Sequence, residues 1–334
     1  MTIKAQFPDE QTADGRFARQ ADAFRGWVTA DGSSAFPAEA GRYHLYVSLA
    51  CPWAHRTVIV RKLKALDHAV GMTVVDPIRD ERGWRFSPIE PDPVNGWRYL
   101  SEAYDVSDPH YAGRITVPVL WDRQTKGIVS NSDDDIMRMF ETEFNAFGDS
   151  GLNLYPIELR DEIDRLNELI YETVNDGVYR AGFATSQKAY EDAAYRLFDT
   201  LDSMESRLST RRYLFGSQPV ESDWRFFVTL LRFDAVYNGH FKCNLRRIAD
   251  YPNLFGYLRD LYQIDGVAQT VNFDHIKRHY YYTHDDINPT RIVPIGPLQD
   301  LEAPHGRERL EWGSSVSNVS TQANVSQPGL GKAE

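Results

Sequence analysis

The residue best placed to do chemistry is Cys51, one of two cysteines in the 334-residue chain. Residues 43–47 before it read as a strand, and Pro52 follows where a helical pattern begins. The unpaired N–H groups of that first helical turn would face the sulfur, and the positive end of the helix dipole favours the reactive thiolate. The sequence therefore predicts a nucleophilic thiol, with a small buried hydrophobe as the alternative.

The neighbours of Cys51 indicate how such a thiol would turn over. The motif ends in Ala54, where a second cysteine would be needed to resolve a mixed disulfide. The resolving thiol must then come from solution, and glutathione is the abundant choice. His55 and Arg56, on the next turn, could add positive potential at the sulfur.

A second motif, Val117-Pro118, comes just before a predicted strand. In thioredoxin-like folds such a Val-Pro bond is typically cis, and it places a backbone segment beside the cysteine, where it can pair with a peptide-like thiol. An ordinary proline on an edge strand is the alternative. The presence of Cys51 upstream favours the first interpretation.

These residues need a sheet and a helix to hold them, and the first half of the chain has both patterns. Between residues 42 and 122, short apolar runs alternate with a helical run, which indicates βαβ construction. The predicted elements are a strand at 43–47, a helix at 54–66, a strand at 71–77, a hairpin from 115–121 and 127–129, and a helix from Asp133. Residues 79–114 show no sustained periodicity, which is typical of a functional loop or an insertion.

Beyond residue 156 the chain is dominated by long amphipathic segments, which predict an all-helical part. The predicted helices lie at about 157–178, 186–209, 222–238, 253–262 and 273–279. We expect four regions along the chain: an N-terminal extension at 1–41, a thioredoxin-like domain at 42–145, an all-helical domain at 155–311 and a flexible tail at 312–334.

Composition narrows the classes of function. The formal net charge of −11 and the pI near 5.3 give a field that repels nucleic acid and anionic membranes. The sequence shows neither a leader-like apolar run at its start nor a stretch of the roughly 18 apolar residues that span a bilayer. We therefore expect a cytoplasmic protein with reduced thiols that binds neither nucleic acid nor membrane.

The segments around these motifs resemble a known family. Residues 46–64, 113–122, 175–191, 230–244 and 275–297 are similar to strings found in the glutathionyl-hydroquinone reductases, the Xi class of the glutathione transferase superfamily. The likeness spans roughly residues 10–298. It implies an α/β N-terminal thioredoxin-like domain followed by an all-α C-terminal domain, and a homodimer.

The resemblance also implies roles for individual residues. Cys51 would attack the sulfur of a glutathionyl-hydroquinone, release the hydroquinone and remain as a mixed disulfide with glutathione, which a second glutathione clears. Trp84 matches a tryptophan that covers bound glutathione, and Val117 supplies a backbone pair to its cysteinyl part. Tyr179 and Tyr280 match tyrosines that bond the hydroquinone oxygens.

Two positions depart from the family pattern. Ser132 and Asp133 stand where an acidic residue followed by serine is expected, so we expect the serine to take the γ-glutamyl carboxylate and the aspartate the ammonium, with the order exchanged. Val220 stands where the superfamily usually has a Ser or Thr capping a core helix, with Asp223 still three residues on. The missing hydroxyl would cost about 1 kcal/mol.

Other candidates have ordinary explanations. His275, His279 and His284 have a spacing that could present two imidazoles on one helical face, but no further ligands complete a set, so we predict no metal. The tyrosines at 280–282 could be core or interface aromatics, although phenols also suit a hydroquinone.

Two other functions stay open. The chain could be a conjugating or dehalogenating glutathione transferase in which Cys51 only positions glutathione, although cysteine favours mixed disulfides. It could also be a non-catalytic binding module with the same fold. The intact Cys51-Pro52 motif and the tyrosines favour a glutathione-dependent reductase of glutathionylated quinols.

Overall fold

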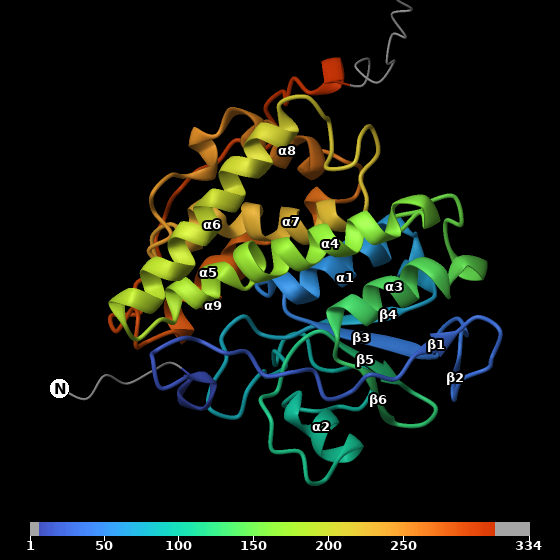
Figure 1. Ribbon diagram of the computed structural model, residues 1–334. Coiled ribbons are helices and arrows are strands. Elements are labelled where there is room, and N and C mark those ends of the chain that lie inside the picture. Colours follow the sequence, from blue (N-terminus) through green and yellow to red (C-terminus); the bar gives the residue numbers. More distant parts are fainter. Residues whose placement is uncertain (1–6, 311–334) are drawn as a thin grey trace, which may run out of the picture.

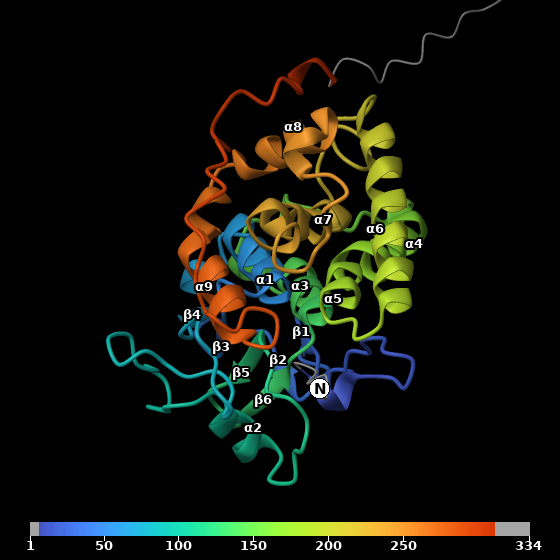
Figure 2. The same cartoon turned by 90° about the vertical axis from the view of Figure 1, so that its left-hand side faces the viewer.

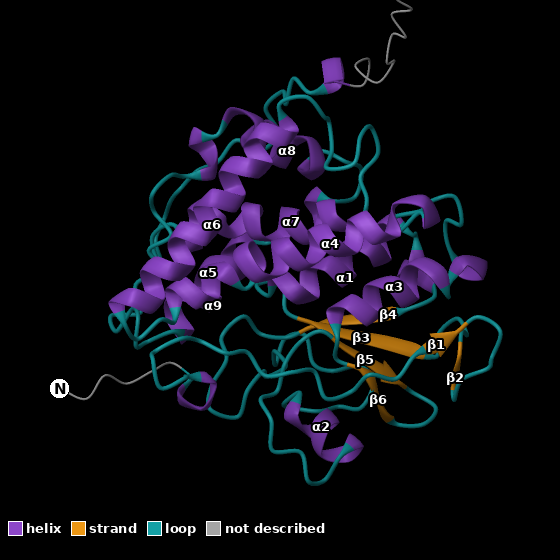
Figure 3. Cartoon of the chain, in the orientation of Figure 1, coloured by secondary structure: helices purple, strands orange, loops and turns teal. Residues whose placement is uncertain are grey.

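A computed structural model of the protein describes residues 7–310. The chain forms one part built around a β-sheet and a second part in which helices pack on one another (Figure 1 and Figure 3). The predicted tail at 312–334 lies outside the described residues.

The main sheet has four strands in the order β4-β3-β5-β6. Their bounds are Tyr43–Val47 for β3, Gly71–Val74 for β4, Val119–Asp122 for β5 and Gly127–Ser130 for β6. Strand β3 is parallel to β4 and antiparallel to β5, and β5 pairs antiparallel with β6 as the predicted hairpin. All five residues of β3 are buried, because helices cover this central strand.

Three helices belong to this part: α1 at Pro52–Leu63, α2 at Ser101–Ser107 and α3 at Asp133–Thr142. Helices α1 and α3 pack together on the face of the sheet that looks toward the second part, and α2 lies beyond the other face (Figure 1 and Figure 2). The short helix α2 lies within the stretch that was expected to be irregular. Its seven residues span less than two turns, too few to produce a readable periodicity.

The second part is helical, as predicted. Its helices are α4 at Arg160–Ile170, α5 at Gly177–Gly182, α6 at Gln187–Leu208, α7 at Glu221–Arg232, α8 at Pro252–Tyr262 and α9 at Phe273–Thr283. Two π-helical segments, Tyr171–Asn175 and Phe233–Tyr237, extend α4 and α7. All twelve residues of α7 are buried, and this helix packs on α1 of the first part.

The N-terminal residues join the two parts. After a short 3₁₀ helix at Pro8–Glu10, they form a small parallel pair, β1 at Val28–Thr29 and β2 at Phe36–Pro37. The carbonyl of Gly15 accepts a 3.0 Å bond from the N–H of Thr185 in the helical part, and Gly26 donates a 2.8 Å bond to Val129 in the sheet. This region therefore contributes to the packing of both parts.

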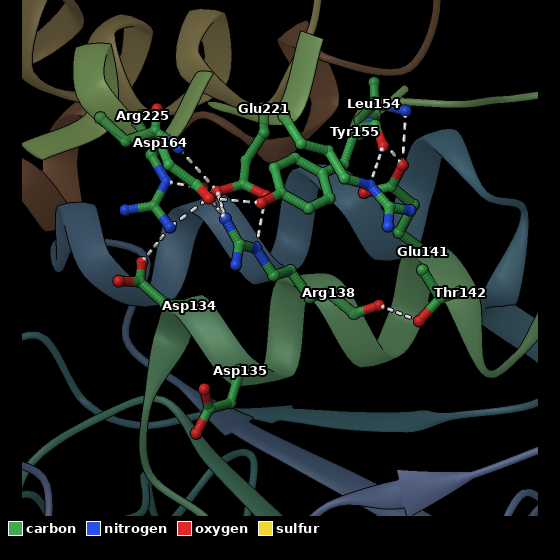
Figure 4. A network of polar contacts seen from close by, with 12 residues as sticks. Asp134, Asp135, Arg138, Glu141, Thr142, Leu154, Tyr155, Asp164, Glu221 and Arg225 are labelled. Carbon is green, nitrogen blue, oxygen red and sulfur yellow. Dashed lines mark hydrogen bonds and ion pairs between the residues drawn. The ribbon is translucent and has the colours of Figure 1, made fainter. Parts of the chain in front are cut away.

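A network of ion pairs also joins the parts (Figure 4). Arg138 on α3 contacts Glu221 on α7 at 3.0 Å and Asp164 on α4 at 2.6 Å. Arg225 on α7 contacts both Glu221 and Asp134 on α3 at 2.7 Å. Because Glu221 is fully buried, its two arginine partners are needed to offset the loss of hydration.

The described residues include no helix that is both long enough and apolar enough to cross a membrane.

Candidate active site

Cys51 lies at the N-cap of α1, as its motif predicts. Its backbone is extended, with φ −74° and ψ 121°, and its sulfur accepts a 3.5 Å bond from the N–H of Ala54. The Cys51 sulfur also lies 3.6 Å from the carbonyl oxygen of Val117. The Val117–Pro118 peptide bond is cis, so the second predicted motif has the geometry expected of it.

The pKa of the Cys51 thiol is a balance of opposing effects. Burial raises it, whereas the N–H groups of Ala54 and Trp53 and the positive charge of Arg232 lower it. In the ligand-free protein the net direction is upward. This is the opposite of what the helix N-terminus alone predicts, because the surrounding protein removes water from the thiolate.

The two residues expected to add positive potential at Cys51 do not act as free cations. His55 is 1% exposed, and its Nε2 lies 2.7 Å from the Thr270 hydroxyl. Because burial lowers the pKa of His55 well below the usual range, the imidazole is neutral. Arg56 is neutralised by Asp133, whose carboxylate lies 2.7 Å from its Nη1.

A cavity of about 90 Å³ that opens to solvent lies beside Cys51. Its lining includes Trp84, Val117, Tyr179 and Tyr280, four of the residues predicted to form the site. Three arginines, Arg19, Arg79 and Arg114, also line the cavity. No carboxylate from the described part of the chain lines it, but Arg19 pairs with Asp176 at 2.9 Å and Arg114 pairs with Glu10 at 2.8 Å, so within residues 7–310 only Arg79 of the three has no carboxylate partner.

Three tyrosine hydroxyls meet at one end of this site. The Tyr280 hydroxyl lies 2.5 Å from that of Tyr179 and 3.0 Å from that of Tyr237. Burial raises the pKa of all three phenols, so each keeps its proton. Tyr237 was not predicted as a site residue. It lies within residues 230–244, one of the segments that carry the family resemblance, and that segment was the available signal.

Trp84 is held against the helical part. Its ring stacks on His279 with centroids 4.9 Å apart and planes 23° apart, and His279 Nδ1 donates a 2.8 Å bond to the Pro77 carbonyl. Burial lowers the pKa of His279 to about 3. His284 Nδ1 lies 3.3 Å from His240 Nε2, so His279 and His284 both have hydrogen-bonding partners within the protein. No group of three or more His, Cys, Asp or Glu residues suited to a metal ion occurs between residues 7 and 310.

Ser132 and Asp133 lie at the start of α3 and do not line the cavity. The Ser132 hydroxyl caps the helix by accepting a 3.4 Å bond from the N–H of Asp135. The Asp133 carboxylate faces Arg56, yet burial and the neighbouring Asp134 raise its pKa. In the free protein both side chains therefore have partners within the chain.

Comparison with known proteins agrees with this geometry. The glutathione S-transferase N-terminal domain model matches residues 50–143, and the C-terminal domain model matches residues 187–260. The chain is 52% identical to glutathionyl-hydroquinone reductase YqjG of Escherichia coli over 90% of this chain and 94% of that protein. It is 49% identical to glutathionyl-hydroquinone reductase PcpF of Sphingobium chlorophenolicum, over 88% of this chain and 93% of that one. The chain belongs to the glutathionyl-hydroquinone reductase family.

Solved structures of this reductase family have the same fold. The glutathione-bound structure of E. coli YqjG superposes with a TM-score of 0.84 over 85% of this chain and 96% of that chain. The Xi transferase of Phanerochaete chrysosporium, 50% identical, superposes with a TM-score of 0.82 over 84% of this chain and 98% of that one. The two-part fold expected from the sequence is therefore confirmed.

Arg19 also lines the cavity, although the sequence did not predict it as a site residue. Arg19 comes from the N-terminal region, and its guanidinium lies 4.6 Å from the Trp53 ring centroid and 4.8 Å from that of Tyr179. Asp176 holds it with a 2.9 Å ion pair. Nothing in the local pattern around Arg19 indicates such a role, because every one of these contacts is distant along the chain.

Proposed function

We propose that the protein catalyses the glutathione-dependent reduction of glutathionyl-hydroquinones to hydroquinones, with Cys51 as the nucleophile. The observation that carries the proposal is that one cavity brings together the Cys51 sulfur and the phenols of Tyr179 and Tyr280. A thiolate and hydroxyl donors in one pocket suit a substrate that has both a thioether sulfur and ring oxygens.

The chemistry has two steps. The Cys51 thiolate attacks the sulfur of the substrate thioether, the carbon–sulfur bond breaks, and the electron pair passes to the ring carbon, which takes a proton to give the hydroquinone. The product on the enzyme is a disulfide between Cys51 and glutathione. A second glutathione thiolate then attacks the glutathione sulfur of that disulfide, which releases oxidised glutathione and restores the Cys51 thiolate.

Tyr179 and Tyr280 suit the first step because they remain protonated. Two hydrogen bonds join the three tyrosine hydroxyls and use two of their three protons. In this proposal one of the hydroxyl protons turns from its tyrosine partner to a ring oxygen of the substrate. A hydrogen bond that strengthens as the ring accepts electron density lowers the barrier to attack.

For glutathione itself we propose that Trp84 covers the tripeptide and that the Val117 backbone pairs with its cysteinyl unit. Ser132 and Asp133 would take the γ-glutamyl carboxylate and ammonium. Since Asp133 pairs with Arg56 in the free protein, this step includes a change of partner at Asp133. Arg79, the cavity arginine that has no carboxylate partner within residues 7–310, would supply positive charge near the bound anion.

We propose further that residues 42–145 form the glutathione-binding domain and that residues 155–311 carry the hydroquinone pocket. The protein would act as a homodimer in the cytoplasm. Light scattering of the purified protein tests the dimer.

The decisive assay mixes the enzyme with a glutathionyl-hydroquinone and excess glutathione and follows both products by chromatography. We expect free hydroquinone and oxidised glutathione in equal amounts. A protein that instead joins glutathione to a quinone, with no oxidised glutathione formed, would be a conjugating transferase.

A further inference from the structure

Arg232, the last residue of α7, lies fully buried beneath the loop that precedes Cys51. Its Nε donates a 2.8 Å bond to the carbonyl of Ala50, and its Nη2 donates a 3.0 Å bond to the carbonyl of Leu49. A residue of the helical part thus fixes the two peptide units before the nucleophile, from 182 positions away in the case of Ala50.

The remaining partners of Arg232 are neutral. Its Nη1 donates to the Val228 carbonyl at 2.9 Å and lies 3.2 Å from His55 Nδ1. The Thr270 hydroxyl donates to the Val267 carbonyl at 2.6 Å, so it accepts the proton of His55 Nε2 at 2.7 Å. His55 is therefore the neutral Nε2–H tautomer, and its bare Nδ1 accepts from the guanidinium.

The positive charge of Arg232 is thus uncompensated. Within residues 7–310 no carboxylate forms an ion pair with it, whereas Arg225 on the same helix pairs with both Glu221 and Asp134. An unpaired buried charge is costly, and its field is weakly screened because water is excluded. The charge of Arg232 therefore acts on the nearby Cys51 thiol with little screening, and it lowers the pKa of that thiol.

We propose that Arg232 is the positioning residue of Cys51: its guanidinium holds the carbonyls that precede the nucleophile, and its uncompensated charge favours the thiolate. This inference rests on the proposed role of Cys51. Among the groups around the thiol, Arg232 lowers its pKa and Asp133 raises it. The other charged or titratable side chains that line the cavity with the thiol are Arg19, Arg79, Arg114, Tyr179, His279, Tyr280 and His284.

The test measures the acidity of Cys51 directly, without the hydroquinone substrate. The alkylation rate with iodoacetamide is followed from pH 5 to pH 10 and assigned to Cys51 by peptide mass. In Arg232→Gln we expect the pKa of Cys51 to rise by about one unit, and the alkylation rate at pH 7 to fall about tenfold. Circular dichroism and the melting temperature report whether the variant is folded.

Arg307 offers a matched control. It is also buried and donates to backbone carbonyls, those of Leu208 and Asn253 among them, but it has no contact with the loop before Cys51. Arg307→Gln should lose comparable stability and keep the pKa of Cys51. A folded Arg232→Gln protein with an unchanged pKa at Cys51 would overturn the proposal.

If Arg232→Gln does not fold, Arg232→Lys decides, because it keeps the charge and loses the forked donors. A pKa of Cys51 within about half a unit of the wild-type value supports the electrostatic role, and a rise of a full unit contradicts it. Either result is independent of hydroquinone turnover, so failure of the proposed function would be seen separately.

Discussion

The hydroxyl oxygens of Tyr179 and Tyr280 lie 2.5 Å apart, although 101 positions separate the two residues in the chain. One comes from α5 and the other from α9, so their contact depends on the packing of the helical part. In the free protein the two phenols satisfy each other. A substrate oxygen that enters between them exchanges one hydrogen bond for another and leaves no buried hydroxyl unpaired.

Tyr179→Phe and Tyr280→Phe should each lower kcat/KM for a glutathionyl-hydroquinone, because each removes a hydroxyl and keeps the ring. The expected loss of transition-state stabilisation, calculated from kcat/KM, is about 1 to 3 kcal/mol. Reduction of hydroxyethyl disulfide should hardly change, since its leaving group is a thiolate. Both rates are measured with the same enzyme preparation. Equal losses on the two substrates would remove these tyrosines from the quinol site.

Tyr237→Phe is the matched variant for this pair. The Tyr237 hydroxyl lies 3.0 Å from that of Tyr280, but Tyr237 is fully buried and does not line the cavity. We expect a smaller loss than for Tyr280→Phe on the glutathionyl-hydroquinone, measured as kcat/KM. A larger loss would mean that Tyr237 itself contacts the substrate.

Cys51→Ala should abolish reduction of both substrates and keep the fold, because it removes the nucleophile and little volume. Cys243→Ala should retain activity, since Cys243 is fully buried and burial raises the pKa of its thiol far above the usual range. Mass spectrometry after a single turnover without added glutathione should find one glutathione adduct on Cys51. An adduct on Cys243 would indicate a two-cysteine cycle.

Glu141 should make stability depend on pH. Burial raises its pKa from 4.5 to about 7 in the folded protein, where its carboxyl accepts bonds from the N–H groups of Leu154 and Tyr155 (Figure 4). Between these two pKa values the folded state holds the proton that the unfolded chain releases. Stability is therefore lost as the pH rises through this range.

Glu141→Gln removes this titration. Urea unfolding at pH 5 and pH 7.5 should show the variant gaining about 2 kcal/mol relative to the wild type at the higher pH. Glu168→Gln, on the exposed face of α4, is the control and should show no such gain. If the free energies of unfolding of Glu141→Gln and the wild type differ by the same amount at both pH values, the pKa of Glu141 is not raised in the folded protein.

Val220→Thr should stabilise the protein by about 0.5 to 1 kcal/mol by supplying the missing N-cap hydroxyl of α7. The acidic half of the cap is already present, because Asp223 accepts a 2.8 Å bond from the N–H of Val220. Thermal and urea unfolding measure the stability of both Val220→Thr and Val220→Ala. Val220→Ala reports the effect of losing apolar volume alone, and Val220→Thr reports the effect of the added hydroxyl. If Val220→Thr is no more stable than the wild type, the 3.0 Å bond from the N–H of Asp223 to the Val220 carbonyl already satisfies this end.

Local signals predicted the parts of the site that depend on local structure. Cys51-Pro52 marks a helix start in any fold, and Val117-Pro118 could be interpreted from its order along the chain. Arg19 and Arg232 could not be found in this way, because the ion pair of Arg19 with Asp176 and the bond of Arg232 to Ala50 each join segments more than 150 positions apart. Periodicity reports which face of an element is buried, and it does not report which distant element covers that face.

The sequence also did not predict which groups supply positive charge at Cys51. The positive potential expected from His55 comes instead from Arg232, since burial keeps His55 neutral. Residue type alone does not reveal the cost of removing water from a group. The start of α3 shows the same limit, because Asp133 already has a partner in Arg56.

The joining of the two parts by the N-terminal residues has a consequence for biosynthesis. Phe17 and Arg19 precede Cys51 along the chain, yet the cavity that they line is closed by Tyr280 and His284, near the other end of the described residues. During synthesis, Cys51 therefore leaves the ribosome long before the residues that complete its cavity. During that interval the Cys51 thiol is exposed without the tyrosines that line the cavity of the folded protein.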